Sequence, residues 1–472
     1  MRIPSPASSN GEPGAKLGAF TVVARRAIDD MWARGEGGQQ VLIATGPGPA
    51  LALEAHALRS LAGKLAVPRV LDSAEDERHG PYLVLELPRP GAKSITAAVA
   101  ELGPAQALAL VEESLEYAVA LEHAGLGWTP RIEDFYVLDG RLGLRRLRGA
   151  RRLGKNGRID ARHVVEELGG AFVAEPGSLL PPRFLHFVLP SRTPRGIAES
   201  ATVETARAEL RAVAGELAIP HDEHPGCATL SDLGLLRERH EDAVAVAKGD
   251  GYGVVVVCDG VSASYRSDVA SALAVATVRD RLVHERDTKE PTGAIHDAIR
   301  EAHQAICDQR EATGHDPAGT TIVAALVQGR RVSVGWVGDS RAYWLGAGGD
   351  ALLTRDHSWL NDVLASGVLT PEEALASPHA HALTRCLGPL EGGDPLLHAA
   401  PDLLEFEAPG PGYLVLCTDG LWNYFPSPDD LASIAARAGG SARPAAIARA
   451  LVNGALTQGG QDNVTVAVLA VT

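Results

Sequence analysis

The second half of the sequence constrains the fold most strongly, because short apolar runs of strand-forming residues alternate there with loops and two long helical patterns. The six runs are DAVAVA, GVVVVC, TIVAALV, RVSVGWV, YLVLC and VTVAVLAV, and the helical patterns cover residues 267–285 and 292–311. Several runs are apolar at successive positions, which is typical of strands covered on both faces. This half is therefore predicted to be an α/β structure with its strands in sheets and its helices outside.

The length of 472 residues indicates two or three domains, since roughly 150 residues is a usual domain size. A helical pattern rich in Ala, Glu and Arg at residues 198–217 is followed by IPHDEHPG, which has two prolines and no periodicity. We therefore place the boundary there. The prediction is a flexible lead over residues 1–16, a first domain over 17–218 and a second domain over 224–472.

The charge balance disfavours two classes of partner. A net charge of -15 and a pI near 5.5 argue against binding to nucleic acid or to an anionic membrane surface, because both require a positive footprint. One segment differs, since residues 141–158 contain eight arginines and lysines and no acid. Two interpretations of it stay open: a docking surface for an acidic partner, or a solvated face.

The sequence also bears on the compartment. The first residues, MRIPSPASSNGEPG, lack the apolar segment of a signal peptide, and no run reaches the roughly 20 apolar residues needed to cross a bilayer. The five cysteines form no CxxC pair, which fits a reducing environment better than a disulfide framework or a zinc ribbon. We expect a cytoplasmic protein without a membrane partner.

Carboxylates recur where the apolar strands of the second half meet loops. They are Glu241, Asp242, Asp259, Asp339, Asp419 and Asp462. Any one of them could be an ordinary turn residue, because Asp-Gly and Gly-Asp pairs mark tight turns. As a set they present hard oxygen ligands at several strand ends, and such ligands suit Mg²⁺ or Mn²⁺.

The flanking segments strengthen the case for the set. RERHEDA, CDG, GTT, VGDSRAY, TRDHS, CTDG and QDNVTV occur in this order, and together they resemble the motifs of the metal-dependent protein phosphatase family (PPM, type 2C). The resemblance covers nearly the whole minimal domain of that family. It implies an α-β-β-α sandwich of two antiparallel sheets flanked by helices, and hydrolysis of phosphoserine and phosphothreonine in proteins.

The resemblance also implies a metal centre. Asp259, with the carbonyl of Gly260 beside it, matches the ligand that bridges two metal ions. Glu241 matches a ligand of one ion, and Asp419 and Asp462 match ligands of the other. The implied cofactors are two Mg²⁺ or Mn²⁺ ions.

Three further residues take roles from the same motifs. Asp242 matches a carboxylate that holds metal-bound water, and Asp339 matches a residue associated with a weaker third ion. Arg237 matches the arginine that grips the substrate phosphate, for which a planar guanidinium offers two parallel charge-assisted hydrogen bonds. An ordinary surface arginine is the alternative for Arg237.

The chemistry follows without the family name. Two divalent ions about 3.5–4 Å apart lower the pKa of a bridging water and neutralise a phosphoryl group, which permits in-line attack without a covalent intermediate. The carboxylates that hold the ions repel one another when no metal is bound, so the empty site should be destabilised and should bind metal avidly.

Some positions leave questions open. Many relatives carry a histidine after the Asp-Gly pair, whereas Val261 follows it here, so the familiar proton donor is absent. His357 could donate a proton to the leaving alkoxide or could fix a loop by hydrogen bonds. The segment Gly319, Thr320 and Thr321 is interpreted as structural support.

The first half resembles a protein kinase in layout: a strand at residues 41–45, a helix with Glu54, a hinge-like YLVLELPRPG and a loop-like LEHAGLGWTPRIEDFYV. Thr45 stands where an active kinase needs a lysine, and residues 147–151 replace the metal-binding DFG segment. An inactive kinase-like domain (a pseudokinase) and an unrelated α/β or helical regulatory domain both remain open.

Two functions from different classes follow. The first is a protein phosphatase regulated or targeted by an inactive kinase-like domain, with phosphoproteins as substrates and a protein kinase or its targets as partners. The second is a non-catalytic adaptor that binds phosphoproteins through inactive phosphatase and kinase domains.

Overall fold

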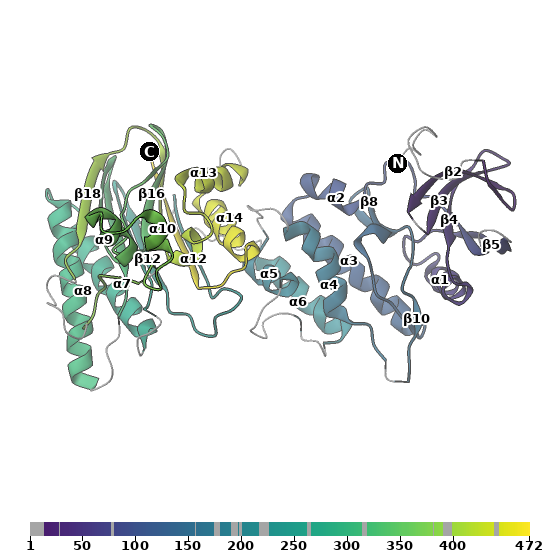
Figure 1. Cartoon of the computed structure of the whole chain (residues 1–472), viewed down its shortest axis with the longest axis horizontal. Coiled ribbons are helices and arrows are strands. Elements are labelled where there is room, and N and C mark those ends of the chain that lie inside the picture. The colour runs from purple at the N-terminus through teal and green to yellow at the C-terminus, as the bar shows by residue number, and fades with distance from the viewer. Residues whose placement is uncertain are drawn as a thin grey trace. The chain divides into compact units, whose positions relative to one another are not determined.

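The computed structural model describes residues 14–27, 29–76, 80–155, 157–173, 180–189, 197, 201–216, 226–261, 266–313, 319–380, 382–389, 399–438 and 443–472. Most of the predicted lead, residues 1–13, lies outside this range. The chain divides into two units (Figure 1). The first comprises residues 1–174, 186–189 and 194–217, and the second comprises residues 175–185, 190–193 and 218–472.

The first unit begins with a six-stranded antiparallel sheet in the order β1-β2-β3-β4-β6-β5. Its strands are β1 (Lys16–Leu17), β2 (Phe20–Ala27), β3 (Asp30–Gly35), β4 (Gln40–Thr45), β5 (Val70–Asp76) and β6 (Gly80–Glu86). The helix α1 (Gly48–Leu61) follows β4 and starts with a proline in its first turn. The four central residues of β4 are buried, as expected for an inner strand with both neighbours paired.

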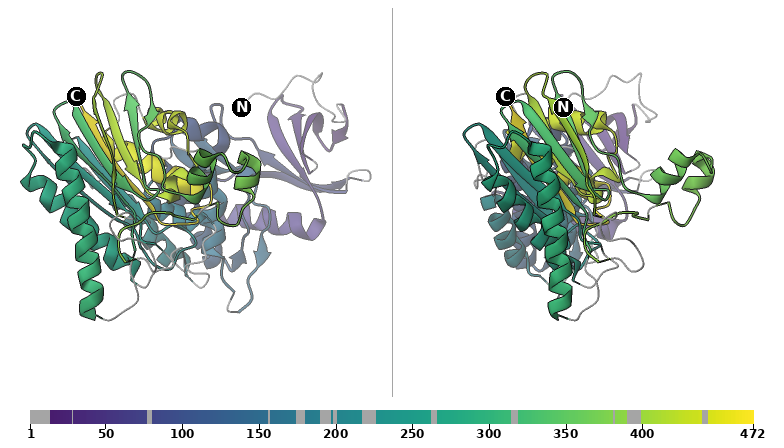
Figure 2. Two further views of the ribbon diagram at one scale, coloured as in Figure 1. Left: turned by 60° about the vertical axis from the view of Figure 1, so that its left-hand side comes forward. Right: turned by 90° about the vertical axis from the view of Figure 1, so that its left-hand side faces the viewer.

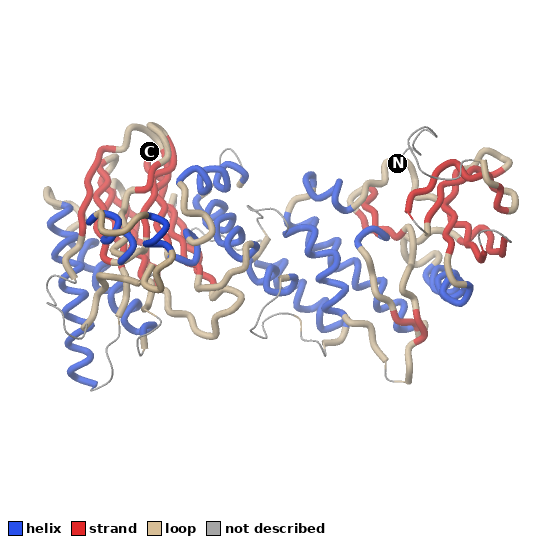
Figure 3. The backbone as a smooth tube through the Cα atoms, viewed as in Figure 1, coloured by secondary structure: helices blue, strands red, loops and turns tan. Residues whose placement is uncertain are grey.

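Helices dominate the rest of this part of the chain (Figure 3). The longest is α3 (Pro104–His123), and the Gln106 side chain accepts a hydrogen bond from the Gly103 N–H at its start. The other elements are α2 (Ile95–Ala98), η2 (Val99–Glu101), β7 (Leu126–Gly127), η3 (Ile132–Asp134), β8 (Phe135–Leu138), β9 (Arg141–Leu144), β10 (Arg151–Arg152), α4 (Ala161–Val173) and α6 (Val203–Glu216). The helix α5 (Pro182–Val188) is divided between the two units after residue 185. Asp139 and Gly140, both with positive φ, form the two-residue turn between β8 and β9.

The basic segment at residues 141–158 is buried or half-buried at its centre and exposed at its ends, so both interpretations made for it are wrong only for the central arginines. The Arg146 side chain is 3% exposed and donates two hydrogen bonds to Glu54 on α1, at 2.7 and 2.8 Å. It also pairs with Asp30 at the start of β3. Arg148 pairs with Asp134 at 2.8 Å. These arginines bind internal acids, so neither a solvated face nor a surface for an acidic partner describes them.

The second unit contains two five-stranded antiparallel sheets, β12-β13-β14-β15-β18 and β11-β20-β19-β16-β17. The first has β12 (Ala243–Gly249), β13 (Tyr252–Cys258), β14 (Ile322–Gln328), β15 (Arg331–Val337) and β18 (Asp402–Glu407). The second has β11 (Cys227–Asp232), β16 (Arg341–Gly346), β17 (Ala351–Leu352), β19 (Gly412–Cys417) and β20 (Val464–Val471). Two antiparallel sheets are the arrangement that was predicted for this half of the chain.

Helices flank both sheets of the second unit (Figure 1). The helices α7 (Ser267–His284) and α8 (Pro291–Thr313) pack on the β12–β15 sheet, while α13 (Pro428–Arg437) and α14 (Pro444–Thr457) pack against strands of the other sheet. Shorter helices are α9 (Trp359–Ser366), α10 (Pro371–Leu375) and α12 (Asp419–Trp422), and the green α9 and α10 project from the sandwich in Figure 2. Among the described residues, no helix has both the length and the apolar character needed to span a membrane.

Strand β13 explains why the apolar runs lack alternation. Val254 and Val256 pack into the core beneath α7 and α8, whereas Val255 and Val257 pack into the core between the two sheets. Both faces of the strand are therefore covered by apolar side chains. The prediction of strands covered on both faces is confirmed here.

Candidate active site

Strand register brings the predicted carboxylates to one end of the sandwich. Ala243 on β12 pairs with Cys258 on β13, so Asp242 and Asp259, the next residues outward, are neighbours. In the other sheet, Cys417 on β19 pairs with both Arg341 on β16 and Val466 on β20. The segments that contain Asp339, Asp419 and Asp462 therefore leave this sheet at the same end of its strands.

The backbone of Asp259 is held from both sides. Its N–H donates to Thr321 Oγ1 at 3.0 Å, and its carbonyl accepts from Thr320 Oγ1 and from the Thr321 N–H, both at 2.8 Å. Both threonines are buried. The GTT segment thus fixes the position of Asp259, as the interpretation of it as structural support predicted.

Gly260 occupies a place where no side chain fits. A Cβ atom there would lie 2.7 Å from the Glu241 carbonyl oxygen and 2.9 Å from the backbone carbon of Ser267. The Gly260 N–H donates to the same Glu241 carbonyl at 3.2 Å. This close approach joins the end of β13 to the segment that leads into β12, and it requires glycine.

Glu241 and Asp242 each accept a hydrogen bond from a hydroxyl group. Ser267 Oγ, at the start of α7, donates to Glu241 Oε1 at 2.8 Å, and Thr418 Oγ1 donates to Asp242 Oδ2 at 2.9 Å. The Glu241 N–H donates to Asn463 Oδ1 at 2.7 Å. These hydroxyl and amide groups orient the two carboxylates from opposite sides of the site.

Asp419 and Asp462 approach from the second sheet. Asp419 is the first residue of α12, and its Oδ2 accepts from Asn423 Nδ2 at 3.1 Å. Asp462 pairs with the guanidinium of Arg237, and the two side chains are 29% and 35% exposed. The arginine predicted to bind phosphate therefore lies at the site, beside a predicted metal ligand.

Asp339 is linked to α12 through a tryptophan. Trp422 Nε1 donates to the Asp339 carbonyl at 2.9 Å. The guanidinium of Arg341 lies 3.8 Å from the centre of the Trp422 ring, and it donates to both oxygens of Asp356 at 2.9 and 2.7 Å. This stack sets the distance between the segment that carries Asp339 and the helix that begins at Asp419.

The carboxylates raise one another's pKa values. Burial, followed by neighbouring aspartates, raises the pKa of Asp242 to about 7 and that of Asp339 to about 7. The pKa of Asp259 is raised well above its ordinary value by burial and then by Asp242, Asp419 and Asp339, in that order. Burial and Asp462 also raise the pKa of Asp419. The site therefore carries an excess of negative charge, which favours the binding of a cation.

The donor set fits small divalent cations. Carboxylate oxygens and a backbone carbonyl are the ligands that Mg²⁺ and Mn²⁺ prefer, and the carboxylates outnumber the single guanidinium of Arg237 that pairs with them. Within the described part of the chain, no three His, Cys, Asp or Glu side chains are spaced to enclose a metal ion by themselves.

His357 fixes a loop, which is one of the two roles considered for it. Its Nδ1 accepts from the Gly338 N–H at 3.1 Å, and its ring stacks on Trp336. Nε2 lies 3.4 Å from Asp402. Burial lowers the pKa of His357, so the ring is neutral and engaged on both nitrogens at neutral pH.

Several residues of the site were not anticipated from the sequence. They are Ser267, Thr418, Trp422 and Asn463. Each acts through a hydrogen bond to a carboxylate or to its backbone. The one available signal was position, since all four lie within eight residues of a predicted ligand in sequence.

Comparison with known proteins finds relatives of the same half of the chain. Residues 237–453 match the family described as Protein phosphatase 2C. The chain is 32% identical over 246 residues to the serine/threonine protein phosphatase PstP of Mycobacterium tuberculosis, a match that spans 51% of this chain and only 44% of PstP. It is 30% identical over 241 residues to the serine/threonine phosphatase stp of Listeria monocytogenes, which covers 50% of this chain and 92% of that protein.

Solved structures of related proteins match the same half. The M. tuberculosis phosphatase PstP/Ppp is 31% identical, with a TM-score of 0.42, over 51% of this chain and 96% of that structure. The catalytic domain of PstP, solved in complex with two manganese ions, is 30% identical with a TM-score of 0.42, over 52% of this chain and 98% of that structure.

Proposed function

The chain belongs to the protein phosphatase 2C family, and we propose that its second unit hydrolyses phosphoserine and phosphothreonine in proteins. The observation that supports the proposal most strongly is that carboxylates at strand ends of both sheets lie together at one end of the sandwich. The guanidinium of Arg237 lies among them. Aspartates that serve only as turn residues would not need to lie close together, and they would not need to raise one another's pKa values.

The metal ligands in this proposal are divided between the two sheets. Asp259, with the carbonyl of Gly260 beside it, would hold metal together with Glu241, which lies next to α7. Asp419 and Asp462 would hold metal from the second sheet. Mg²⁺ or Mn²⁺ supplies an activated water and neutralises the phosphoryl charge when bound.

The remaining residues orient the reactants. Asp242 holds water in position through the carboxylate that Thr418 fixes. Arg237 binds the substrate phosphate, and to do so it exchanges its present bond to Asp462 for bonds to phosphoryl oxygens. Asp339 would hold a third, weaker ion.

No side chain in the described part of the site is placed as a general acid. Val261 stands where relatives have a histidine, and His357 is engaged on both ring nitrogens. We propose that the leaving alkoxide takes its proton from water. The rate should then depend on the acidity of the leaving group, so an aryl phosphate should react faster than an alkyl phosphate.

Phosphate release from synthetic phosphopeptides tests the proposed activity. With Mn²⁺, peptides that carry phosphoserine or phosphothreonine should release phosphate, and chelation of the metal should abolish the release. A folded, metal-loaded protein that binds these peptides without releasing phosphate would instead support the non-catalytic adaptor.

We further propose that the first unit is an inactive kinase-like regulator that directs the phosphatase to phosphoproteins, to a protein kinase or to the targets of that kinase in the cytoplasm. In support, α1 follows the strand that ends at Thr45, as the kinase layout requires, and Glu54 on that helix is occupied by Arg146 instead of a lysine. No autophosphorylation is expected. Transfer of phosphate from ATP to the chain itself would contradict the assignment.

A further inference from the structure

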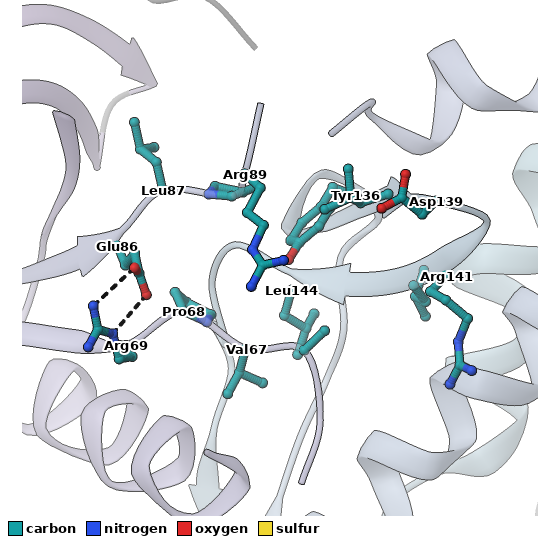
Figure 4. Close-up of a pocket in the computed structure, with 14 residues that line it drawn as sticks. Val67, Pro68, Arg69, Glu86, Leu87, Arg89, Tyr136, Asp139, Arg141 and Leu144 are labelled. Atoms are coloured by element: carbon teal, nitrogen blue, oxygen red, sulfur yellow. Dashed lines mark hydrogen bonds and ion pairs between the residues drawn. The ribbon is translucent and has the colours of Figure 1, made fainter. Parts of the chain in front are cut away.

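A pocket in the first unit has no role in the proposed phosphatase chemistry. It measures about 640 Å³ and lies between the segment 66–69, the segment 86–89 that follows β6, and the β8–β9 hairpin (Figure 4). Pockets of about 300–1,000 Å³ are typical of small-molecule sites. All of its lining residues belong to the first unit.

Part of the pocket wall is apolar. Val67 and Pro68 form one side, and Leu138, Leu142 and Leu144 of the hairpin form another. Such a surface accommodates an apolar ligand body and leaves specificity to a few polar groups.

The charged groups at the pocket differ in whether they are already paired. Arg69 binds Glu86 through two hydrogen bonds of 3.0 and 3.1 Å, which Figure 4 marks with dashed lines. Arg141 pairs with Glu113 at 2.6 Å. Arg89 is exposed and has no ion pair or side-chain hydrogen bond with any described residue. It is the guanidinium available to a ligand.

Arg89 extends toward the phenol of Tyr136, whose side chain lies in the pocket (Figure 4). Burial raises the pKa of the Tyr136 hydroxyl, while Arg145 and Arg89 oppose that rise. The hydroxyl is therefore protonated at neutral pH and can donate a hydrogen bond. A guanidinium and a hydroxyl donor together suit an anionic oxygen.

A second guanidinium adds positive charge behind the phenol. Arg145 is 4% exposed, and its Nε and Nη2 atoms have no hydrogen-bond partner among the described residues. Its guanidinium lies 5.9 Å from the centre of the Tyr136 ring. Burial and then the charge of Arg26 lower its pKa to about 10, so it remains cationic at neutral pH. A buried guanidinium with unsatisfied N–H groups is unfavourable, and a nearby anion would offset part of that cost.

Of the two acids that line the pocket, Asp139 has no cation partner among the described residues, and it does not face the proposed anion position. It sits in the turn of the hairpin, and in Figure 4 its carboxylate lies on the other side of Tyr136 from Arg89. The lining contains three arginines and two acids. The charge balance therefore favours an anion at the Arg89 end.

We propose that this pocket binds a small organic anion, with a carboxylate or phosphoryl group held by Arg89 and the Tyr136 hydroxyl and an apolar body against the leucines of the β8–β9 hairpin. The site lies outside the phosphatase machinery, so the proposal stands or falls separately from the proposed activity.

Ligand-detected saturation-transfer NMR on the full-length protein tests the proposal, with metal removed by chelation. The probes are 2-naphthoate, 2-naphthylphosphonate, which cannot be hydrolysed as an ester, and the neutral 2-naphthylmethanol. At least one anionic probe should bind saturably and at least tenfold more tightly than the neutral probe, since a charge-assisted hydrogen bond contributes about 1.5–3 kcal/mol. Preference for the carboxylate or for the phosphonate distinguishes the two head groups.

Substitutions locate the binding. Arg89→Gln should weaken the anionic probe about tenfold or more, and Tyr136→Phe about two- to tenfold. Arg158→Gln is the matched control, because Arg158 is an exposed arginine of the same unit outside the pocket lining, and it should leave binding unchanged. Arg237→Gln should also leave binding unchanged, which separates this pocket from the phosphatase site.

Three results would overturn the assignment. The first is no saturable binding of either anionic probe, and the second is equal affinity for the anionic and neutral probes. The third is an Arg89→Gln protein, folded by circular dichroism, that binds the anionic probe as tightly as the unmodified protein does. Binding of an acidic peptide but of neither naphthyl anion would likewise overturn a site for small ligands.

Discussion

Asp259→Asn is expected to stabilise the metal-free protein, although the proposal places Asp259 at the centre of the active site. Asp242, Asp419 and Asp339 all raise the pKa of its carboxyl. A carboxyl whose pKa rises from 3.8 to about 7, as for Asp242 and Asp339, is disfavoured by about 4 kcal/mol when it ionises in the folded state. The carboxylates of the site repel one another jointly, and they are partly exposed. We therefore expect neutralisation of Asp259 alone to raise the free energy of unfolding by about 1–3 kcal/mol.

The pH dependence gives the sign of the effect. The folded-state pKa of Asp259 lies above its unfolded value, so ionisation destabilises the fold at high pH, and the penalty disappears as the pH falls and the folded carboxyl becomes protonated. The gain from Asp259→Asn should therefore be largest near pH 8 and should shrink toward pH 5. Thermal unfolding in a chelator measures it as a rise of about 2–10 °C. At saturating Mn²⁺ the unmodified protein should instead be more stable than the Asp259→Asn protein, because the metal stabilises the unmodified protein more.

Asp356→Asn is the matched control for this experiment. Asp356 accepts two hydrogen bonds from Arg341, and the two side chains are 10% and 13% exposed. Its removal leaves a mostly buried guanidinium without a partner and should destabilise the protein by about 3 kcal/mol. If Asp259→Asn lowered the metal-free stability in the same way, Asp259 would be an ordinary structural carboxylate and the reasoning about repulsion would be refuted.

Three further changes test other parts of the structure. Glu54→Gln should destabilise the first unit by about 3–5 kcal/mol, because it leaves Arg146 buried and underpaired, and hydrogen exchange of amides in β4 and α1 should become about 100-fold faster or more; an unchanged exchange rate would contradict a role for this pair. Trp422→Phe removes the donor to the Asp339 carbonyl and should raise the Mn²⁺ concentration for half-maximal phosphate release about tenfold, with a normal rate at saturation; a lower rate at every Mn²⁺ concentration would point to another role. Arg237→Lys loses the bidentate geometry and should raise KM for phosphopeptides about tenfold without altering the Mn²⁺ dependence, and an unchanged KM would remove Arg237 from substrate binding.

The positions of the site carboxylates could be predicted because strand ends leave a strong pattern in sequence. An apolar run followed by Asp-Gly, as at Asp259 and Asp419, indicates both the strand and the loop that carries the ligand. Antiparallel pairing then brings these ends together, since register fixes which residues are neighbours. The helix α7, predicted over residues 267–285, was also found within one residue of those bounds.

The supporting residues could not be found in the same way. Ser267 and Asn463 act through single hydrogen bonds, which leave no periodic trace in the sequence. The ion pairs of the buried arginines could not be predicted from the sequence either. Arg146 pairs with Glu54, which is 92 positions away in the chain, so a local reading of its basic segment could not reveal its partner.

Anomalous diffraction from crystals grown with Mn²⁺ is the decisive measurement for the proposed two-metal site. Two strong peaks are expected about 3.5–4 Å apart, bridged by Asp259, with Asp419 and Asp462 on one side and Glu241 on the other. Asp259→Asn crystals should lose at least one peak. An unmodified, folded protein with no manganese peak among these carboxylates, or with a single peak that does not contact Asp259, would contradict the account.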